Sequence, residues 1–168
     1  GRDWHATGTD AAFNLTGPWG TLRDLRLALR GRHQVENAAT AVAACWLLRE
    51  QGLDIPEVAI RAGLAAVNWP GRLEVVREQP LVVVDGAHNV DAAARLAEAL
   101  VDTFGPRRRT FVLGIARDKD ISAMLKILAP LADRIIATAS HHPRAADPAQ
   151  VAAAARAAGG TGTTVEEA

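Results

Sequence analysis

The feature that most limits the fold is an alternation of short apolar runs and helix-length amphipathic segments in the second half of the chain. The run at 81–84 is apolar at every position, which is typical of a parallel strand covered on both faces. We expect strands at 81–84, 110–115, 134–139 and 163–165, with helices at 91–104, 120–129 and 148–158. This order predicts an α/β fold with an open, mostly parallel sheet covered by helices. Ligands of such sheets bind at the carboxyl edge of the strands.

The first part of the chain follows a different pattern. We expect, in order, a hairpin at 11–30, helices at 34–51 and 56–66, and a strand at 73–77. Gly52 stands just beyond the first helix, where glycine commonly ends helices, and Pro56 suits the first position of the second helix. We place the domain boundary near the end of this strand, after residue 76, which gives domains 1–76 and 77–168.

Composition excludes several classes of function. The 168 residues carry 19 basic and 19 acidic side chains, for a formal net charge of +0, so the chain lacks the basic field that draws proteins to nucleic acid. No apolar run approaches the roughly 18 residues that a membrane span needs. Cys45 is the only cysteine, which excludes a disulfide framework and a cysteine zinc site. We therefore expect a cytoplasmic protein that binds neither nucleic acid nor a membrane, and we also expect it to be a monomer.

One polar motif, at 85–89, directly follows the apolar strand and precedes a helix. Asp85 would lie at the ligand edge of the sheet, and Gly86 permits a close approach to a ligand. His88 and Asn89 would stand beside a helix N-terminus, which favours anions. This arrangement suits a nucleotide or a phosphorylated intermediate. A structural interpretation also remains, in which Asp85 and Asn89 cap the helix and His88 packs locally.

Two further motifs lie earlier in the chain. At 69–74, proline and glycine fix the chain direction and display Arg72, whose guanidinium could make paired bonds to phosphate or carboxylate. A solvated surface turn is the alternative. At 31–39, Asn37 stands in the first turn of an apolar helix, where its carboxamide could pair with the donor and acceptor edge of adenine. It could equally be an ordinary helix-start residue.

The remaining polar clusters point less clearly to a function. The adjacent His141 and His142 cannot easily share one metal ion and lack partners at ligand spacing, so we assign no metal ligand. Asp118 or Asp120 is expected to cap a helix, although Lys119 could assist an anionic substrate. No G-x-x-x-x-G-K-[ST] segment occurs, so we do not expect this chain alone to cradle a triphosphate.

Taken together and in this order, the motifs at 31–39, 69–74 and 85–89 resemble the second half of folylpolyglutamate synthase/dihydrofolate synthase, in the Mur ligase superfamily. The resemblance implies that 1–76 is the C-terminal part of a central ATPase domain with its linker. It implies that 77–168 is a truncated, Rossmann-like, glutamate-binding C-terminal domain. In that family ATP phosphorylates a carboxylate of dihydropteroate or of a folate, and the amine of glutamate attacks the acyl phosphate to form an amide.

The resemblance also implies roles for single residues. Asn37 would contact adenine, Arg72 the nucleotide phosphates or ribose, and Asp85 the ribose hydroxyls. His88 would be catalytic, near the transferred phosphate and the incoming glutamate. Phosphoryl transfer depends mainly on positioning and charge neutralisation, which such groups supply. ATP and Mg²⁺ are the expected cofactors, and the P-loop and metal ligands of the family belong to its first half.

We expect the chain to be an internal piece of a larger protein, inactive without the P-loop domain as its partner. It begins at Gly1, and the segment at 163–167 has the form of a capping box in which Thr164 and Glu167 would open a further helix. Two alternatives stay open. The chain could belong to a Mur-type ligase of cell-wall peptides, or it could be a non-enzymatic α/β module that binds an anion.

Overall fold

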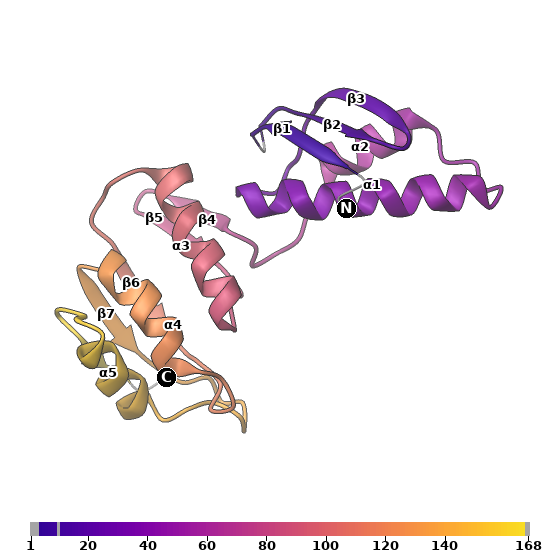
Figure 1. The fold of residues 1–168 in the computed structure, drawn as a ribbon. Helices are drawn as coiled ribbons and strands as arrows, with labels where there is room; N and C mark the ends of the chain where they lie inside the picture. Colours follow the sequence, from indigo (N-terminus) through magenta and orange to yellow (C-terminus); the bar gives the residue numbers. More distant parts are fainter. Residues whose placement is uncertain (1–3, 10, 167–168) are drawn as a thin grey trace. The chain divides into compact units, whose positions relative to one another are not determined.

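The computed structural model describes residues 4–9 and 11–166. The chain forms two compact units, Gly1–Asp85 and Gly86–Ala168, and each has its own buried apolar core (Figure 1). The domain boundary predicted after residue 76 falls inside a strand of the first unit and stays a prediction.

The first unit opens with an antiparallel sheet in the order β1-β2-β3. Its strands are β1 (His5–Gly8), β2 (Phe13–Gly17) and β3 (Gly20–Leu25). The hairpin predicted over 11–30 is confirmed, because Gly17 pairs with Gly20 across a tight turn that only antiparallel strands allow. Strand β1 lies outside every predicted element, since its residues lack an alternation of apolar side chains.

Two helices pack against this sheet, α1 (Arg32–Glu50) and α2 (Glu57–Ala66), and both confirm predicted helices. Residues of α1 that recur at three- and four-residue steps face the sheet and bury their apolar side chains. The resulting core consists of Phe13, Leu15, Leu22, Leu25, Val35, Ala38, Ala39 and Val42. Pro56 precedes the first turn of α2 as its N-cap, one position before the predicted one.

Helix α1 ends as predicted. Gly52 has a φ of 94°, in the region that glycine adopts most easily. Its N–H donates to the Arg49 carbonyl at 2.9 Å, and the Leu53 N–H donates to the Leu48 carbonyl at 3.1 Å. These two bonds form a Schellman motif, which satisfies carbonyls that the last turn leaves open. The helix begins two residues earlier than predicted, so Asn37 lies in its second turn.

The first unit closes with a hairpin of β4 (Glu74–Glu78) and β5 (Leu81–Val84). The strand predicted at 81–84 is confirmed as β5, but within the first unit it pairs antiparallel with β4, not in parallel. Only Gln79 and Pro80 connect the strands, and a two-residue connection can join only antiparallel neighbours. Val82 and Val84 are 39% and 44% exposed, so the apolar run is not covered on both faces within this unit.

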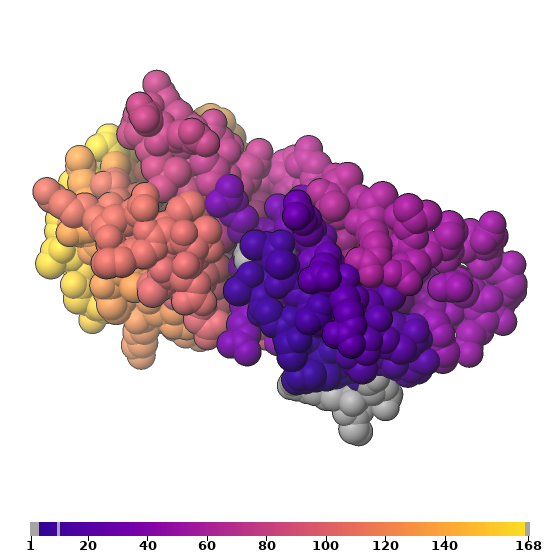
Figure 2. Space-filling model, turned by 90° about the horizontal axis from the view of Figure 1, so that it is seen from above, coloured from indigo at the N-terminus to yellow at the C-terminus, as the bar shows by residue number. Residues whose placement is uncertain are grey.

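The second unit alternates helices and strands as predicted. Its elements are α3 (Val90–Phe104), β6 (Thr110–Leu113), α4 (Ile121–Leu128), the 3-10 turn η1 (Ala129–Leu131), β7 (Arg134–Ala137), α5 (Pro148–Ala157) and β8 (Thr164–Val165). The strands pair in parallel in the order β6-β7-β8, which confirms the parallel α/β sheet. The orange and yellow atoms of this unit therefore lie against one another in the space-filling view (Figure 2).

Side chains fix where the helices of the second unit begin. Asn89 Oδ1 accepts from the Ala92 N–H at 2.7 Å, and Asp120 Oδ1 accepts from the Ala123 N–H at 2.9 Å. Such caps satisfy backbone donors that the first turn cannot pair internally. The core between helices and sheet is built mainly from aliphatic side chains, with Ile115, Ile121, Met124, Leu125, Leu128 and Ile135 as its largest members.

The end of the described chain differs from one expectation. Thr164 lies in β8, beside β7, and the Glu166 N–H donates to the Ala137 carbonyl at 2.9 Å. The interpretation of 163–167 as a capping box is therefore wrong for Thr164, because Val165, which would be the first helical residue after a Thr164 cap, lies in β8 and pairs with Ala137. Residue 167 lies outside the described residues.

Candidate functional site

Arg72 is displayed by a turn whose backbone is held at two points. Glu74 Oε2 accepts from the Gly71 N–H at 2.7 Å. Asp85 Oδ2 accepts from the Leu73 N–H at 2.8 Å. Leu73 has a φ of 46° although it is a buried, non-glycine residue, which is uncommon and depends on support from its surroundings. Within the described residues the exposed Arg72 guanidinium has no hydrogen bond or ion pair, which leaves it available to an external anion.

Asp85 joins two of the predicted motifs, because its carboxylate binds the backbone of the 69–74 turn. The residue is half-buried and ends the first unit. Its side chain is not the cap of α3, since that cap is Asn89. The structural interpretation from the sequence therefore holds for Asn89 and is wrong for Asp85.

His88 is exposed, so it does not pack locally as the structural interpretation required. Its Nδ1 lies 2.9 Å from the Gly86 carbonyl oxygen. A carbonyl oxygen can only accept, so Nδ1 carries the proton and donates it to this bond. In the neutral ring this leaves Nε2 unprotonated, which allows Nε2 to accept a proton or a hydrogen bond.

Asn37 belongs to a chain of hydrogen bonds on α1. Its Nδ2 donates to Gln34 Oε1 at 2.9 Å, and Gln34 Nε2 lies 3.1 Å from His33 Nε2. Asn37 is exposed, whereas Gln34 is 6% exposed. Asn37 therefore presents part of its carboxamide outward while a buried neighbour holds the other part.

The predicted site residues fall in two groups. Asn37, Arg72 and Asp85 belong to the first unit, and His88 belongs to the second. Arg72 and Asp85 are brought together through the backbone of Leu73. Sequence reasoning assigned no role to three contributors: Gln34, Leu73 and Glu74. A polar residue three positions before Asn37 on an apolar helix was a usable signal for Gln34, whereas no periodicity marks Glu74 as the partner of a turn.

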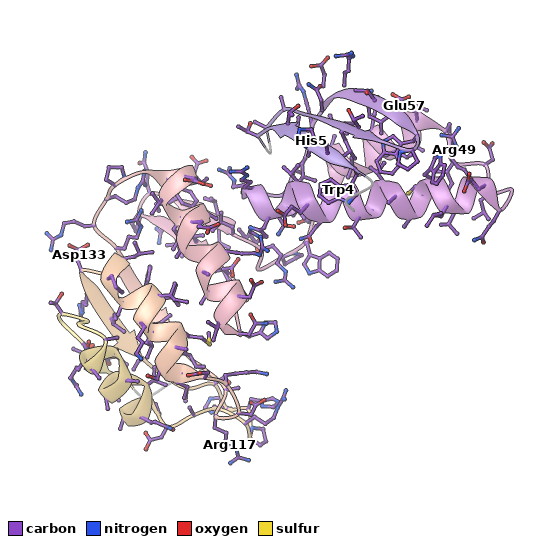
Figure 3. The ribbon with its side chains drawn as sticks, in the orientation of Figure 1. Trp4, His5, Arg49, Glu57, Arg117 and Asp133 are labelled. Atoms are coloured by element: carbon purple, nitrogen blue, oxygen red, sulfur yellow. The ribbon has the colours of Figure 1, made fainter. Side chains whose placement is uncertain are left out.

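A second polar group lies at the carboxyl ends of β6 and β7. Ala116 and Ala145 form an antiparallel bridge, and the Arg117 N–H donates to the Arg144 carbonyl at 2.8 Å. These contacts join the loops that follow the two strands. Figure 3 shows Arg117 at this end of the second unit and Asp133 at the opposite end.

Lys119 of this group is already paired. Its Nζ lies 3.2 Å from Asp118 Oδ2. The hydrogen bond from Lys119, followed by one from the backbone, lowers the pKa of the Asp118 carboxyl below its ordinary value of 3.8. Asp120, one of the two residues predicted to cap a helix, caps α4. Any anionic ligand of Lys119 would therefore compete with Asp118.

The described residues offer neither a metal cluster nor a membrane span. No group of three or more His, Cys, Asp or Glu side chains in 4–9 and 11–166 could hold a metal ion. His142 Nδ1 instead accepts from the Arg144 N–H at 3.1 Å. No helix in these ranges is both long and apolar enough to cross a membrane.

The class of protein follows from a comparison with known families. Residues 71–168 match the family described as "Mur ligase, glutamate ligase domain", and the chain belongs to this Mur ligase family. Within it, the predicted resemblance to folylpolyglutamate synthase/dihydrofolate synthase is confirmed by relatives of that name. The Bacillus subtilis relative is 41% identical over 123 residues, and the Mycobacterium tuberculosis relative is 39% identical over 145 residues.

Solved structures agree with this assignment. The Mycobacterium tuberculosis folylpolyglutamate synthase complexed with ADP matches 99% of this chain with a TM-score of 0.87 and 34% identity. An Escherichia coli enzyme, FolC, in complex with DHPP and ADP matches 100% of the chain with a TM-score of 0.83 and 32% identity.

The chain spans only part of these proteins. It aligns over 73% and 85% of its own length with the two curated relatives, which amounts to 29% and 30% of theirs. It covers 38% of each of the two solved chains.

Proposed function

We propose that this chain is the C-terminal part of an ATP-dependent ligase that adds L-glutamate to dihydropteroate or to a (poly)glutamyl folate. The observation that supports the proposal most strongly is the match of 99% of the chain, at a TM-score of 0.87, to a folylpolyglutamate synthase complexed with ADP. The family description of residues 71–168 as a glutamate ligase domain supports glutamate as the incoming amino acid.

The proposed reaction has two steps. A carboxylate oxygen of the pterin substrate bonds to the γ-phosphorus of ATP, which gives an acyl phosphate and releases ADP. The amine nitrogen of glutamate then bonds to the acyl carbon, inorganic phosphate leaves, and the amine loses a proton to yield the amide. The protein contributes mainly by positioning these groups and neutralising their charge.

The described side chains suit this chemistry. The Asn37 carboxamide would contact adenine, and the exposed Arg72 guanidinium would bind the phosphates or the ribose. Asp85 would accept bonds from the ribose hydroxyls while its Oδ2 holds the turn that displays Arg72. His88 would be catalytic, with Nε2 facing the transferred phosphate or the incoming amine and Nδ1 held by the Gly86 carbonyl. Mg²⁺ would accompany ATP, and no cluster in the described residues fits it, so no step is assigned to the metal through this chain.

We further propose that the chain by itself is inactive, because its sequence lacks a P-loop. ADP should then bind weakly, through the adenine and ribose contacts alone. Heteronuclear NMR of the 168-residue chain with millimolar ADP tests this proposal. We expect shifts at Asn37, Arg72 and Asp85, and no ADP production when ATP, dihydropteroate and glutamate are supplied. Shifts confined to other residues, or turnover by the chain alone, would contradict the proposal.

A further inference from the structure

Gln34 is unusual in this protein because, among the described residues, it is the one polar or charged side chain that is fully buried, at 6% exposed. A buried carboxamide is costly unless its donor and acceptor are both paired. Gln34 pairs both. Its Nε2 bonds to His33 and its Oε1 bonds to Asn37.

The direction of this relay follows from which atoms can donate. Gln34 Nε2 has only protons to give, so His33 Nε2, at 3.1 Å, must be the acceptor. With its amino group committed to His33, Gln34 turns its Oε1 toward Asn37. The Asn37 group that can meet this oxygen is Nδ2, which donates at 2.9 Å. The orientation of the exposed carboxamide is therefore set from the buried side.

This orientation matters for the base that Asn37 meets. An unanchored carboxamide can exchange the places of its oxygen and nitrogen by rotating half a turn. Because Asn37 Nδ2 is tied to Gln34, Oδ1 and the second N–H face outward in one fixed order. Adenine offers an N6 donor beside an N7 acceptor and matches such a pair in this order alone, whereas guanine offers two acceptors, O6 and N7, and mismatches a carboxamide in either order.

We infer that Gln34 is a positioning residue that fixes the Asn37 carboxamide in the one order that pairs with adenine. This inference rests on the proposed role of Asn37 at the base. It assigns Gln34 no contact with the nucleotide. The preference for adenine should therefore fall when Gln34 changes, because AMP binds more weakly even though Asn37 itself is kept.

The test compares variants of the 168-residue chain by NMR, with AMP and GMP as the probes. Gln34→Met keeps the length of the side chain and removes both hydrogen bonds. Gln34→Glu keeps an acceptor for Asn37 and loses the donor to His33. Val42→Ala is the matched control, because it removes buried volume from the same helix, at a residue 1% exposed, without touching the relay.

Two readouts are measured. The first is solvent exchange of the Asn37 Nδ2 protons, one of which should be protected in the wild-type chain, in Gln34→Glu and in Val42→Ala, but not in Gln34→Met. The second is the ratio of AMP to GMP affinity. We expect a preference for AMP of at least about tenfold in the wild type and in Val42→Ala. In Gln34→Met this preference should fall by about twofold to tenfold, because AMP binding must then order the Asn37 side chain while GMP binding changes little.

Each outcome bears on one claim. A Gln34→Met chain that keeps the wild-type preference, or a wild type without a protected Asn37 proton, would overturn the inference. If the proton is protected but neither nucleotide shifts Asn37, the relay stands, while the proposed adenine contact and the base selection both fall. If Asn37→Ala leaves AMP binding unchanged, Asn37 does not contact adenine, and that part of the proposed function is wrong.

Discussion

The residues of the first unit's site act in pairs. One member faces outward, and a hydrogen bond with the other member fixes its position. Asp85 is the clearest case, because its Oδ2 binds the N–H of Leu73. A non-glycine residue at a φ of 46° carries a cost on the order of 1 kcal/mol, which the buried leucine and this hydrogen bond offset. The orientation of Arg72 thus depends on Asp85.

We therefore expect Asp85→Ala to affect activity through two routes, the loss of the ribose contact and the relaxation of the Arg72 turn. In a ligase that contains this chain, kcat/KM should fall by at least about a hundredfold. Asp102→Ala is the matched control, since Asp102 is exposed in the last turn of α3, at the opposite end of that helix from the 85–89 motif. Both variants should unfold within a few degrees of the parent, and near-normal turnover by Asp85→Ala would discredit this site.

Asp118 supplies a prediction about pH. Its pKa is lowered chiefly by the hydrogen bond from Lys119, so folding favours the ionised carboxyl. This contribution is present at pH values above the ordinary 3.8 and is lost as the pH falls through the lower, folded value. An NMR titration of the side-chain carboxyl should give a pKa below 3.8, and Lys119→Met should raise it. Equal values in the two proteins would show that the pair does not form.

The sequence identified Asn37, Arg72 and Asp85 more readily than Gln34 and Glu74, which hold neighbouring groups in place. Asn37, Arg72 and Asp85 stand at chemically suggestive places, after a turn, after a strand or near a helix start. Gln34 and Glu74 act through contacts that depend on rotamers and on the path of the backbone. Such contacts follow from tertiary geometry, which neither periodicity nor turn chemistry encodes.

At the scale of elements, the ends of helices are the best-specified features. Gly52 has a φ of 94° and nothing lies within 4 Å of where a Cβ would stand, so only backbone conformation opposes a side chain there. Gly63 lies inside α2 with similar open space.

The two glycines predict opposite effects of one substitution. Gly52→Ala should destabilise the protein by about 1 kcal/mol, because alanine rarely adopts a positive φ. Gly63→Ala should stabilise it by about 0.5–1 kcal/mol, because alanine favours a helix interior. Denaturant unfolding followed by circular dichroism measures both, and the same sign for both would contradict the assigned end of α1.

Strand direction is the element-level property that the sequence could not supply. The apolar run of β5 resembles the parallel strands of the second unit, and its composition alone favours burial on both faces. The partner is decided by the short connection through Gln79 and Pro80, which brings β4 alongside first. The strands β6, β7 and β8 are separated by helices, and there the predicted parallel pairing is confirmed.

For the whole molecule, two separate cores imply two centres of stability. Leu15 and Leu125 are each fully buried, one in the core of the first unit and one in the core of the second. Truncating either to alanine should cost about 2–5 kcal/mol.

Native-state hydrogen exchange shows which residues each substitution destabilises. Leu15→Ala should speed exchange mainly in residues up to Asp85, and Leu125→Ala mainly in residues after it. If either variant speeds exchange equally in both units, the units unfold together. That result would contradict two separate centres of stability.

Family membership was readable because three motifs occur in a fixed order over most of the chain, and the relatives of the predicted name bear out the membership. The share of the relatives that the chain covers, 29% and 30% for the two curated proteins, had to come from comparison. We therefore propose that Asn37, Arg72 and Asp85 form part of an active site. A separate P-loop domain would supply its phosphate-binding loop.

The most direct test of this proposal is a chimera in which the chain replaces the matching 38% of the Mycobacterium tuberculosis folylpolyglutamate synthase. The measurement is incorporation of labelled L-glutamate into dihydropteroate or folate, resolved by mass spectrometry. We predict an ATP-dependent product one glutamate longer than the substrate. That product should be absent without ATP and from the same enzyme lacking the segment. A folded chimera that binds ADP but never forms this product would contradict the account.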